Sequence, residues 1–298
     1  MRLLVVILGG LLFMSFAAAK NGPTYYTPER IAIGKQNAER DWSQGILRAI
    51  QAGEANTYYI GRQYGSAADC IAQTDDFIWM MQPTTKIPRV LPNHDTLALC
   101  PVHGDKVREL NAWTAWTTDP IHHPYKVRCR LGGEWYPSND YLNGDMTSGE
   151  FPDDGSGCVV DGQKYQFVRY AAHRMYLEYT VPALRGLSMA YLLTGKKEYG
   201  AKAAILLAGI ADQQPGPKYH SEHCYGGPYG YRSGLVTDYI WSNIVAVPIA
   251  QCYDAIYPVY DEAPEVLEFL RAKGLPAATA QDAREFVEEH ILRQTMQA

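Results

Sequence analysis

The stretch Gly132–Tyr141 combines aromatic rings with hydrogen-bonding side chains in the run GGEWYPSNDY. Aromatic faces suit the apolar surface of a sugar ring, and amide or carboxylate groups suit its hydroxyls. The stretch therefore predicts a saccharide contact. The alternative is a loop that its aromatic residues anchor to the domain, with turns at its Gly, Pro and Asn positions. The candidate substrate-binding residues are Trp135, Asn139, Asp140 and Tyr141.

A second candidate group lies on a helix predicted over residues 165–176. On that helix Arg169, His173 and Tyr176 share one face at positions i, i+4 and i+7. Such a set could neutralise a carboxylate and move a proton. The alternative is a structural helix that buries its aromatic face and exposes its arginines.

The start of a later apolar helix, predicted over residues 237–257, supplies the last two candidates. Asp238 and Trp241 could line a cleft there. Equally, Asp238 is an acidic residue suited to the first turn of a helix, and Trp241 is suited to a core. Both interpretations stay open at the level of sequence.

Metal ligation is conceivable at two places. The run CPVHG, which starts at Cys100, is half of a metal-binding knuckle, and Cys129 or Cys158 could contribute to it. No second ligand pair has matching spacing. His220 and His223 lie one helical turn apart, but outside an H-E-x-x-H frame. Disulfides or free buried cysteines are therefore favoured, and neither a metal nor a cofactor is predicted.

The composition is that of a globular protein with ample chain for a core. Of its 298 residues 47% are hydrophobic, and the formal net charge is −5. The absence of a basic excess argues against a nucleic-acid partner, and an acidic ligand would need a local basic cleft. No phosphate-binding loop, nucleophile elbow or dinucleotide fingerprint is present in the sequence.

Residues 1–19 have the layout of a secretory signal peptide. Arg2 precedes the apolar run Leu3–Phe16, and Ala17–Ala19 form a cleavage site before Lys20. A membrane anchor is the alternative, although the run is short for a span. We expect a secreted or periplasmic protein with no stable membrane insertion. All six cysteines would be in the exported chain, and six cysteines allow fifteen pairings.

The clearest structural signal is a pair of helices over residues 176–213. Thr180 is expected to cap the first helix, and Gly195 to end it. The second helix is expected to end near Gln213. Residues 82–165 are expected to be irregular, with short strands around 96–98, 126–129 and 158–160. Further helices are predicted over residues 28–52, 66–81, 165–176, 237–257, 262–273 and 279–297.

Several runs together resemble the heparinase II/III-like polysaccharide lyases over roughly residue 28 to the end. They are GGEWYPSNDY, HRMY, ALRGLSMAYLLTGKKEYGAKAAILLAGIAD and DYIWSNIVAVPIAQCYDAI. The resemblance implies an all-α fold over residues 20–298, an incomplete (α/α) toroid of helical hairpins with a long irregular insertion. CPVHG is similar to a C-P-x-C-G run in some relatives, with His103 at the second cysteine's place, which leaves a paired-thiol role in doubt.

The resemblance also implies chemistry, namely β-elimination at a uronic acid in an acidic polysaccharide or oligosaccharide. Polar groups would neutralise the carboxylate, a Tyr or His base would remove the C5 proton, and a Tyr would protonate the leaving oxygen. The family's catalytic elements and a β-sandwich domain would follow the last helix, so no catalytic residue is assigned and a truncated chain is expected. The alternatives are a glycoside hydrolase on a similar toroid and a non-catalytic carbohydrate-binding protein.

Overall fold

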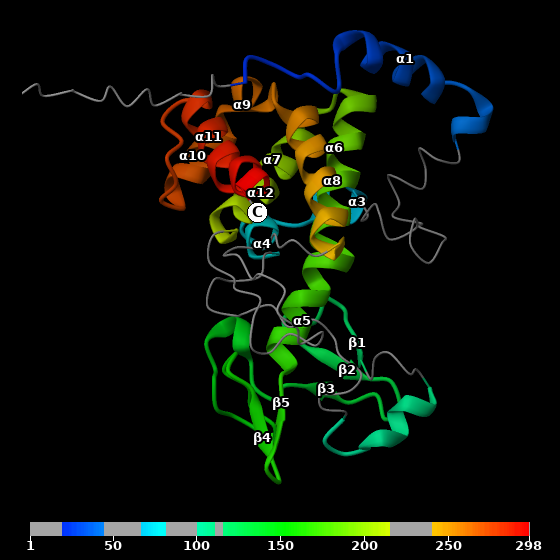
Figure 1. Ribbon diagram of the computed structural model, residues 1–298, viewed down its shortest axis with the longest axis vertical. Helices are drawn as coiled ribbons and strands as arrows, with labels where there is room; N and C mark the ends of the chain where they lie inside the picture. Colours follow the sequence, from blue (N-terminus) through cyan, green and yellow to red (C-terminus); the bar gives the residue numbers. More distant parts are fainter. Residues whose placement is uncertain (1–19, 45–66, 82–99, 111–115, 215–239, 298) are drawn as a thin grey trace, which may run out of the picture.

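The computed structural model describes residues 20–44, 67–81, 100–110, 116–214 and 240–297. Figure 1 shows a group of packed helices, here called the helical body, and a smaller part with short strands below it. We call the smaller part, residues 100–110 and 116–165, the β module. Helix α5 (Phe167–Met175) links the two parts.

The predicted central pair of helices is confirmed. Helix α6 (Val181–Thr194) ends where Gly195 adopts the left-handed conformation, at φ 71°. Helix α7 (Lys197–Gln213) follows, and every residue from Ala203 to Ala211 is buried. A helix that is buried all round lies inside a helical assembly rather than on its surface. Helix α8 (Ile240–Ile256) packs along α6.

Thr180 does not cap α6 as predicted. The chain is helical from α5 through a π-helix, η4 (Tyr176–Thr180), directly into α6. The Thr180 hydroxyl instead donates a hydrogen bond to the carbonyl of Met81. No helix end lies at Thr180, so no free N–H groups are there for its side chain to cap.

Two other predicted helices have different bounds. Helix α1 (Pro28–Ala38) ends well before residue 52, although residues 45–52 lie outside the described part. The helix predicted over 66–81 is two helices, α3 (Ala67–Ala72) and α4 (Asp75–Met80). Thr74 separates them because its side chain accepts the N–H of Phe77 and so begins a new helix.

The C-terminal helices follow, and the first four of them pack against α7. They are α9 (Val259–Glu262), α10 (Pro264–Ala272), α11 (Ala280–Val287), the π-helix η5 (Glu288–Arg293) and α12 (Gln294–Gln297). A capping box between Thr279 and Asp282 begins α11. Among the described residues, no helix has the length and hydropathy needed to cross a membrane.

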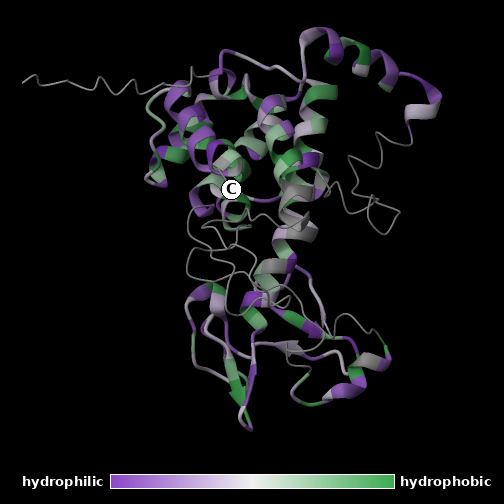
Figure 2. Cartoon of the chain, viewed as in Figure 1, coloured by the Kyte–Doolittle hydropathy of each residue, from purple (hydrophilic) through white to green (hydrophobic). Residues whose placement is uncertain are grey.

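The β module contains two small antiparallel sheets. Strands β1 (Trp116–Thr117), β2 (Val127–Cys129) and β3 (Trp135–Tyr136) form one, in that order. Strands β4 (Cys158–Val160) and β5 (Gln163–Tyr165) form a hairpin. Figure 2 shows the hydrophobic β4 beside the hydrophilic β5. Two 3₁₀ helices, η2 (Asp105–Glu109) and η3 (Tyr141–Asn143), complete the module.

The expectation of an all-α toroid with an irregular insertion is wrong. The described chain is mixed, because the region expected to be irregular holds both antiparallel sheets. The strands predicted near 126–129 and 158–160 are confirmed, and residues 96–98 lie outside the described part. Strands of two or three residues are too short to show an alternating pattern, so the sequence alone could not reveal how the strands pair into sheets.

Gly200 marks the closest approach of α7 to its neighbours. A Cβ atom at this position would lie 2.7 Å from Val259 Cγ2 and 3.0 Å from Tyr191 Cδ2. Gly200→Ala should therefore lower the free energy of unfolding by about 1–3 kcal/mol, because packed neighbours would have to shift. Urea unfolding measures this effect. Gly34→Ala is the matched control, since its Cβ would meet nothing nearer than 3.8 Å. A destabilisation no larger than that of the control would contradict this account of the packing.

A candidate metal centre in the β module

Two turns of the same construction meet in the β module. In the first, the N–H of Gly104 donates to the carbonyl of Cys100 at 2.8 Å. In the second, the N–H of Gly133 donates to the carbonyl of Cys129 at 3.0 Å. Each turn thus begins with a cysteine and closes four residues later on a glycine with positive φ. The construction gives the two cysteines equivalent places in their turns.

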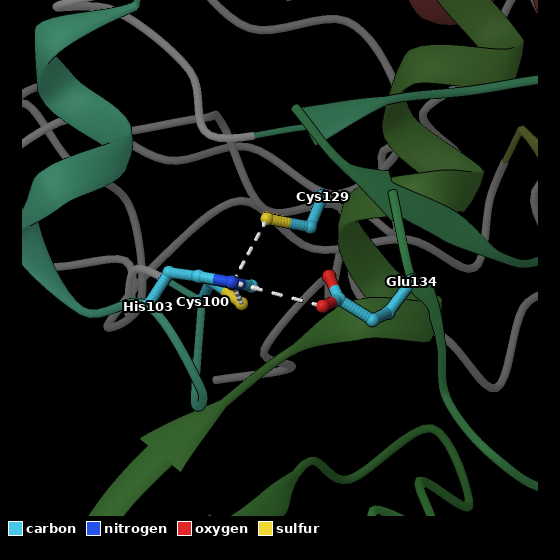
Figure 3. A group of neighbouring side chains, drawn as sticks. All are labelled: Cys100, His103, Cys129 and Glu134. Carbon is cyan, nitrogen blue, oxygen red and sulfur yellow. Dashed lines mark hydrogen bonds and ion pairs between the residues drawn. The ribbon is translucent and has the colours of Figure 1, made fainter. Parts of the chain in front are cut away.

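The two turns bring together four side chains that can bind a metal. Cys100 Sγ lies 3.3 Å and Cys129 Sγ 3.6 Å from Nδ1 of His103. His103 Nε2 lies 3.7 Å from Oε1 of Glu134. One ligand atom from each residue can be chosen so that all lie within 4.8 Å of one another. Figure 3 shows the four side chains converging on a common point.

These separations fit a tetrahedral zinc ion. With Zn–S of about 2.3 Å and Zn–N of about 2.0–2.1 Å, neighbouring S and N ligands should be about 3.6 Å apart. The two S···Nδ1 distances of 3.3 and 3.6 Å match that value. Thiolate and imidazole ligands together favour zinc over the hard cations that bind oxygen. Cys100 and Cys129 are both free thiols in this structure.

The two sulfur atoms have polar neighbours besides His103. Burial raises the pKa of the Cys100 thiol, and the nearby Tyr136 hydroxyl, 3.5 Å from the sulfur, opposes that shift. The N–H of Gly132 points at Cys129 Sγ at 3.5 Å. A buried thiol with a raised pKa is a poor nucleophile, because the thiolate is the reactive form. Metal binding also requires the thiolate, so a bound cation would have to displace the Cys100 proton.

The centre also joins the hydrophobic core of the module. Cys100 and Cys129 pack in one buried cluster with Val107, Trp116 and Tyr136. The aromatic rings of Trp116 and Tyr136 meet edge to face, with centroids 5.6 Å apart. A bound ion would therefore link the 100–104 turn to the sheet across this core.

Two of the predicted saccharide residues hold their own loop together. The side chain of Asn139 is buried and donates to the carbonyls of Asp145, at 2.6 Å, and Asp153, at 3.1 Å. Asp140 accepts hydrogen bonds from Asn143 at the start of η3. These contacts agree with the anchored-loop alternative. A role for the two residues in sugar binding stays a prediction.

The aromatic members of that stretch have neighbours of their own. Trp135 is half-buried and stacks on His123, with ring centroids 4.0 Å apart. The guanidinium of Arg128 lies 5.9 Å from the centre of the Trp135 ring. Tyr141 is half-buried beside Tyr125, with centroids 5.3 Å apart. Trp135 is thus the candidate that lies beside a cationic side chain.

The two helix candidates whose side chains the structure describes, Arg169 and Tyr176, lie in different surroundings. Arg169 donates to the carbonyl of Gly155 at 2.8 Å and so connects α5 to the β module. Tyr176 is buried in the core of the helical body. The side chains of His173 and Trp241, and all of Asp238, lie outside the described part of the structure. Among the described side chains, therefore, no Arg–His–Tyr set is assembled.

Sequence reasoning named Cys129 and Cys158 as possible partners of the CPVHG run without choosing between them, and it missed Glu134. The sequence argument looked for a second pair of ligands with the spacing of Cys100 and His103. The second turn has Gly132 at the position that corresponds to His103. The available signal was the repeated Cys-x-x-x-Gly spacing in C-P-V-H-G and C-R-L-G-G. That spacing places each cysteine four residues before the glycine whose N–H closes its turn.

Comparison with known proteins adds no further constraint. No family model, no curated protein and no solved structure matches this chain. The case for the metal centre therefore rests on the geometry of Cys100, His103, Cys129 and Glu134 itself.

Proposed function

We propose that this chain is a zinc-binding protein whose ion ties the β module together. Cys100, Cys129 and His103 supply the ligands, two of them from the first turn and one from the second. The observation that carries the proposal is the pair of S···Nδ1 distances, 3.3 and 3.6 Å. They are close to the distance between neighbouring sulfur and nitrogen ligands of a tetrahedral zinc ion.

The size of the module supports a stabilising role for the ion. Its strands are two or three residues long, whereas strands of five or six are usual and small sheets need additional packing to be stable. Zinc bound by thiolate and imidazole contributes directly to folding free energy, because the unfolded chain has no preformed site. One ion would connect segments more than twenty residues apart at the centre of the module.

Cobalt substitution tests the proposal. The reduced, metal-free protein should bind one equivalent of Co²⁺ and develop the near-ultraviolet absorption of thiolate-to-cobalt charge transfer together with tetrahedral d–d bands. Zinc should displace the cobalt and abolish both features. A protein that binds no cobalt, or binds it without sulfur charge transfer, would refute the proposal.

The second candidate function is action on an acidic polysaccharide, which the sequence resemblance implies. It is favoured by the outer face of the three-stranded sheet, where Thr117, Arg128 and Trp135 stand side by side across the strands. An open pocket of about 370 Å³ lies there. Its lining residues are Thr117, Arg128, Cys129, Arg130, Leu131, Gly132 and Gly133. The pocket lining carries two arginines, and one of them, Arg128, lies beside the Trp135 indole, which suits an anionic sugar.

This second function predicts that Arg128→Gln weakens binding of a uronate oligosaccharide and leaves binding of a neutral one unchanged. The loss should be roughly tenfold, because a hydrogen bond to a charged group is worth about 1.5–3 kcal/mol. Calorimetric titration gives the affinities, and Lys106→Gln, an exposed residue of η2, is the control. Equal weakening by both variants would argue against a site at Arg128.

A separate assay distinguishes the enzymatic possibilities. Incubation with uronate and neutral polysaccharides should give the ultraviolet absorbance of an unsaturated uronate if the protein is a lyase. New reducing ends without that absorbance would instead support a glycoside hydrolase. Binding without either product would support a carbohydrate-binding protein.

A further inference from the structure

The orientation of His103 distinguishes the two nitrogen atoms of its ring. Nδ1 faces both sulfur atoms, at 3.3 and 3.6 Å, whereas Nε2 faces Glu134 Oε1, at 3.7 Å. A metal held by both sulfurs is therefore bound by Nδ1. The proton of the neutral imidazole then sits on Nε2, directed at the carboxylate (Figure 3).

This arrangement gives Glu134 a role different from that of the three ligands. Histidines that bind metals usually donate their other N–H to a carboxylate, which fixes the ring and makes it a stronger ligand. A separation of 3.7 Å is slightly long for that hydrogen bond and short enough to close with a small side-chain movement. The Glu134 side chain is accessible to solvent, so it has room for such a movement.

We infer that Glu134 positions His103 instead of binding the metal, and that an exchangeable water or small anion occupies the fourth coordination position. The inference rests on the proposed zinc function. Sites with three protein ligands keep a position open to solvent or substrate, whereas four protein ligands close it. The partly exposed His103 and Glu134 give solvent a route to the centre, while both cysteines are buried.

The inference is tested with the cobalt-loaded protein and azide as the probe ligand. Azide should shift the d–d bands and saturate at one equivalent per cobalt, while the sulfur charge-transfer band remains. Glu134→Gln should weaken cobalt binding by about 10- to 100-fold. It should leave the d–d band positions and the response to azide unchanged, because it removes no ligand. Glu109→Gln, an exposed acid on η2, is the matched control and should change neither property.

Each other outcome overturns the inference in a recognisable way. Bands that do not respond to azide show a closed site with four protein ligands. Bands that shift in Glu134→Gln alone show that Glu134 is itself a ligand. Both results leave the zinc proposal intact. Failure of the unmodified protein to bind cobalt through sulfur refutes the zinc proposal and the inference together.

Discussion

Replacing Cys129 with alanine is expected to weaken zinc binding more than 100-fold. Removing a residue that only hydrogen-bonds a metal ligand lowers metal affinity by about 10- to 100-fold. Removing a sulfur ligand should lower the affinity further. At a zinc concentration 100 times its dissociation constant, the unmodified protein should gain about 2.7 kcal/mol of stability. The variant should gain less than about 0.4 kcal/mol at the same concentration. Urea unfolding with and without zinc measures both gains.

Cys158→Ala is the matched control for this experiment. Cys158 is buried in the same hydrophobic cluster as Cys129 and is not a member of the metal-binding group. Its replacement removes the same atoms from the same core, so the zinc-dependent gain should survive. Amide exchange at β2 and β3 should slow with zinc in the control and stay unchanged in Cys129→Ala. Equal loss of zinc binding in the two variants would contradict the assigned ligands.

Asp254→Ala should produce the second large effect, a loss of roughly 3–5 kcal/mol in the free energy of unfolding. The Asp254 carboxylate is buried in α8 and accepts the backbone N–H groups of Thr24, Tyr25 and Tyr26 at 2.7–3.0 Å. It also forms an ion pair with Lys20. Removing it leaves three backbone donors and a cation in a partly buried region without their acceptor, which is why the loss should be large. Denaturant unfolding at neutral pH measures it.

Two comparisons make this prediction specific. Asp76→Ala breaks an ion pair with Lys273 in which the carboxylate is 72% exposed, and it should cost less than about 1 kcal/mol. Asp254→Asn keeps an acceptor of the same size and should be intermediate. If Asp254→Ala costs no more than Asp76→Ala, the N-terminal segment is not held to α8 in this way.

The contribution of Asp254 should depend on pH. Burial alone would raise the pKa of this carboxyl, but hydrogen bonds from Lys20, Thr24 and Tyr26 outweigh it, and the pKa lies below the usual 3.8. A carboxyl with a lowered folded pKa stabilises the protein above the unfolded value and loses this effect as pH falls through the folded value. The difference between the unmodified protein and Asp254→Ala should therefore be constant above about pH 5 and shrink below pH 3.8.

Long periodic elements of this chain could be predicted from the sequence, whereas only some of the short ones could. Leu184 and Leu187 are fully buried, as their helical spacing predicts, and Gly195 ends α6. The break at Thr74 was missed because one capping hydrogen bond outweighed a continuous apolar pattern. Strands β2 and β4 were predicted, but the other three strands and the pairing of all five were not, because strands of at most three residues depend on long-range pairing. The toroid was expected because the helices were the clear signal in the sequence, and strand pairing was not considered.

The candidate metal site could likewise be predicted only as far as local sequence patterns reach. Residue types in the CPVHG run pointed to half a metal site, and the sequence could not show what completes it. The other half comes from β2 and the turn after it, where Cys129 faces inward by strand alternation and Glu134 follows the turn. Which of three cysteines in the module would meet His103 depends on how the strands pair, and that information is not local.

X-ray absorption at the zinc edge tests the central claim most directly. The zinc-loaded protein should show two sulfur ligands at about 2.3 Å and two nitrogen or oxygen ligands at about 2.0–2.1 Å. One of the lighter ligands should have the outer-shell scattering of an imidazole. A shell of nitrogen and oxygen alone, or a shell of four sulfurs, would contradict coordination by Cys100, His103 and Cys129.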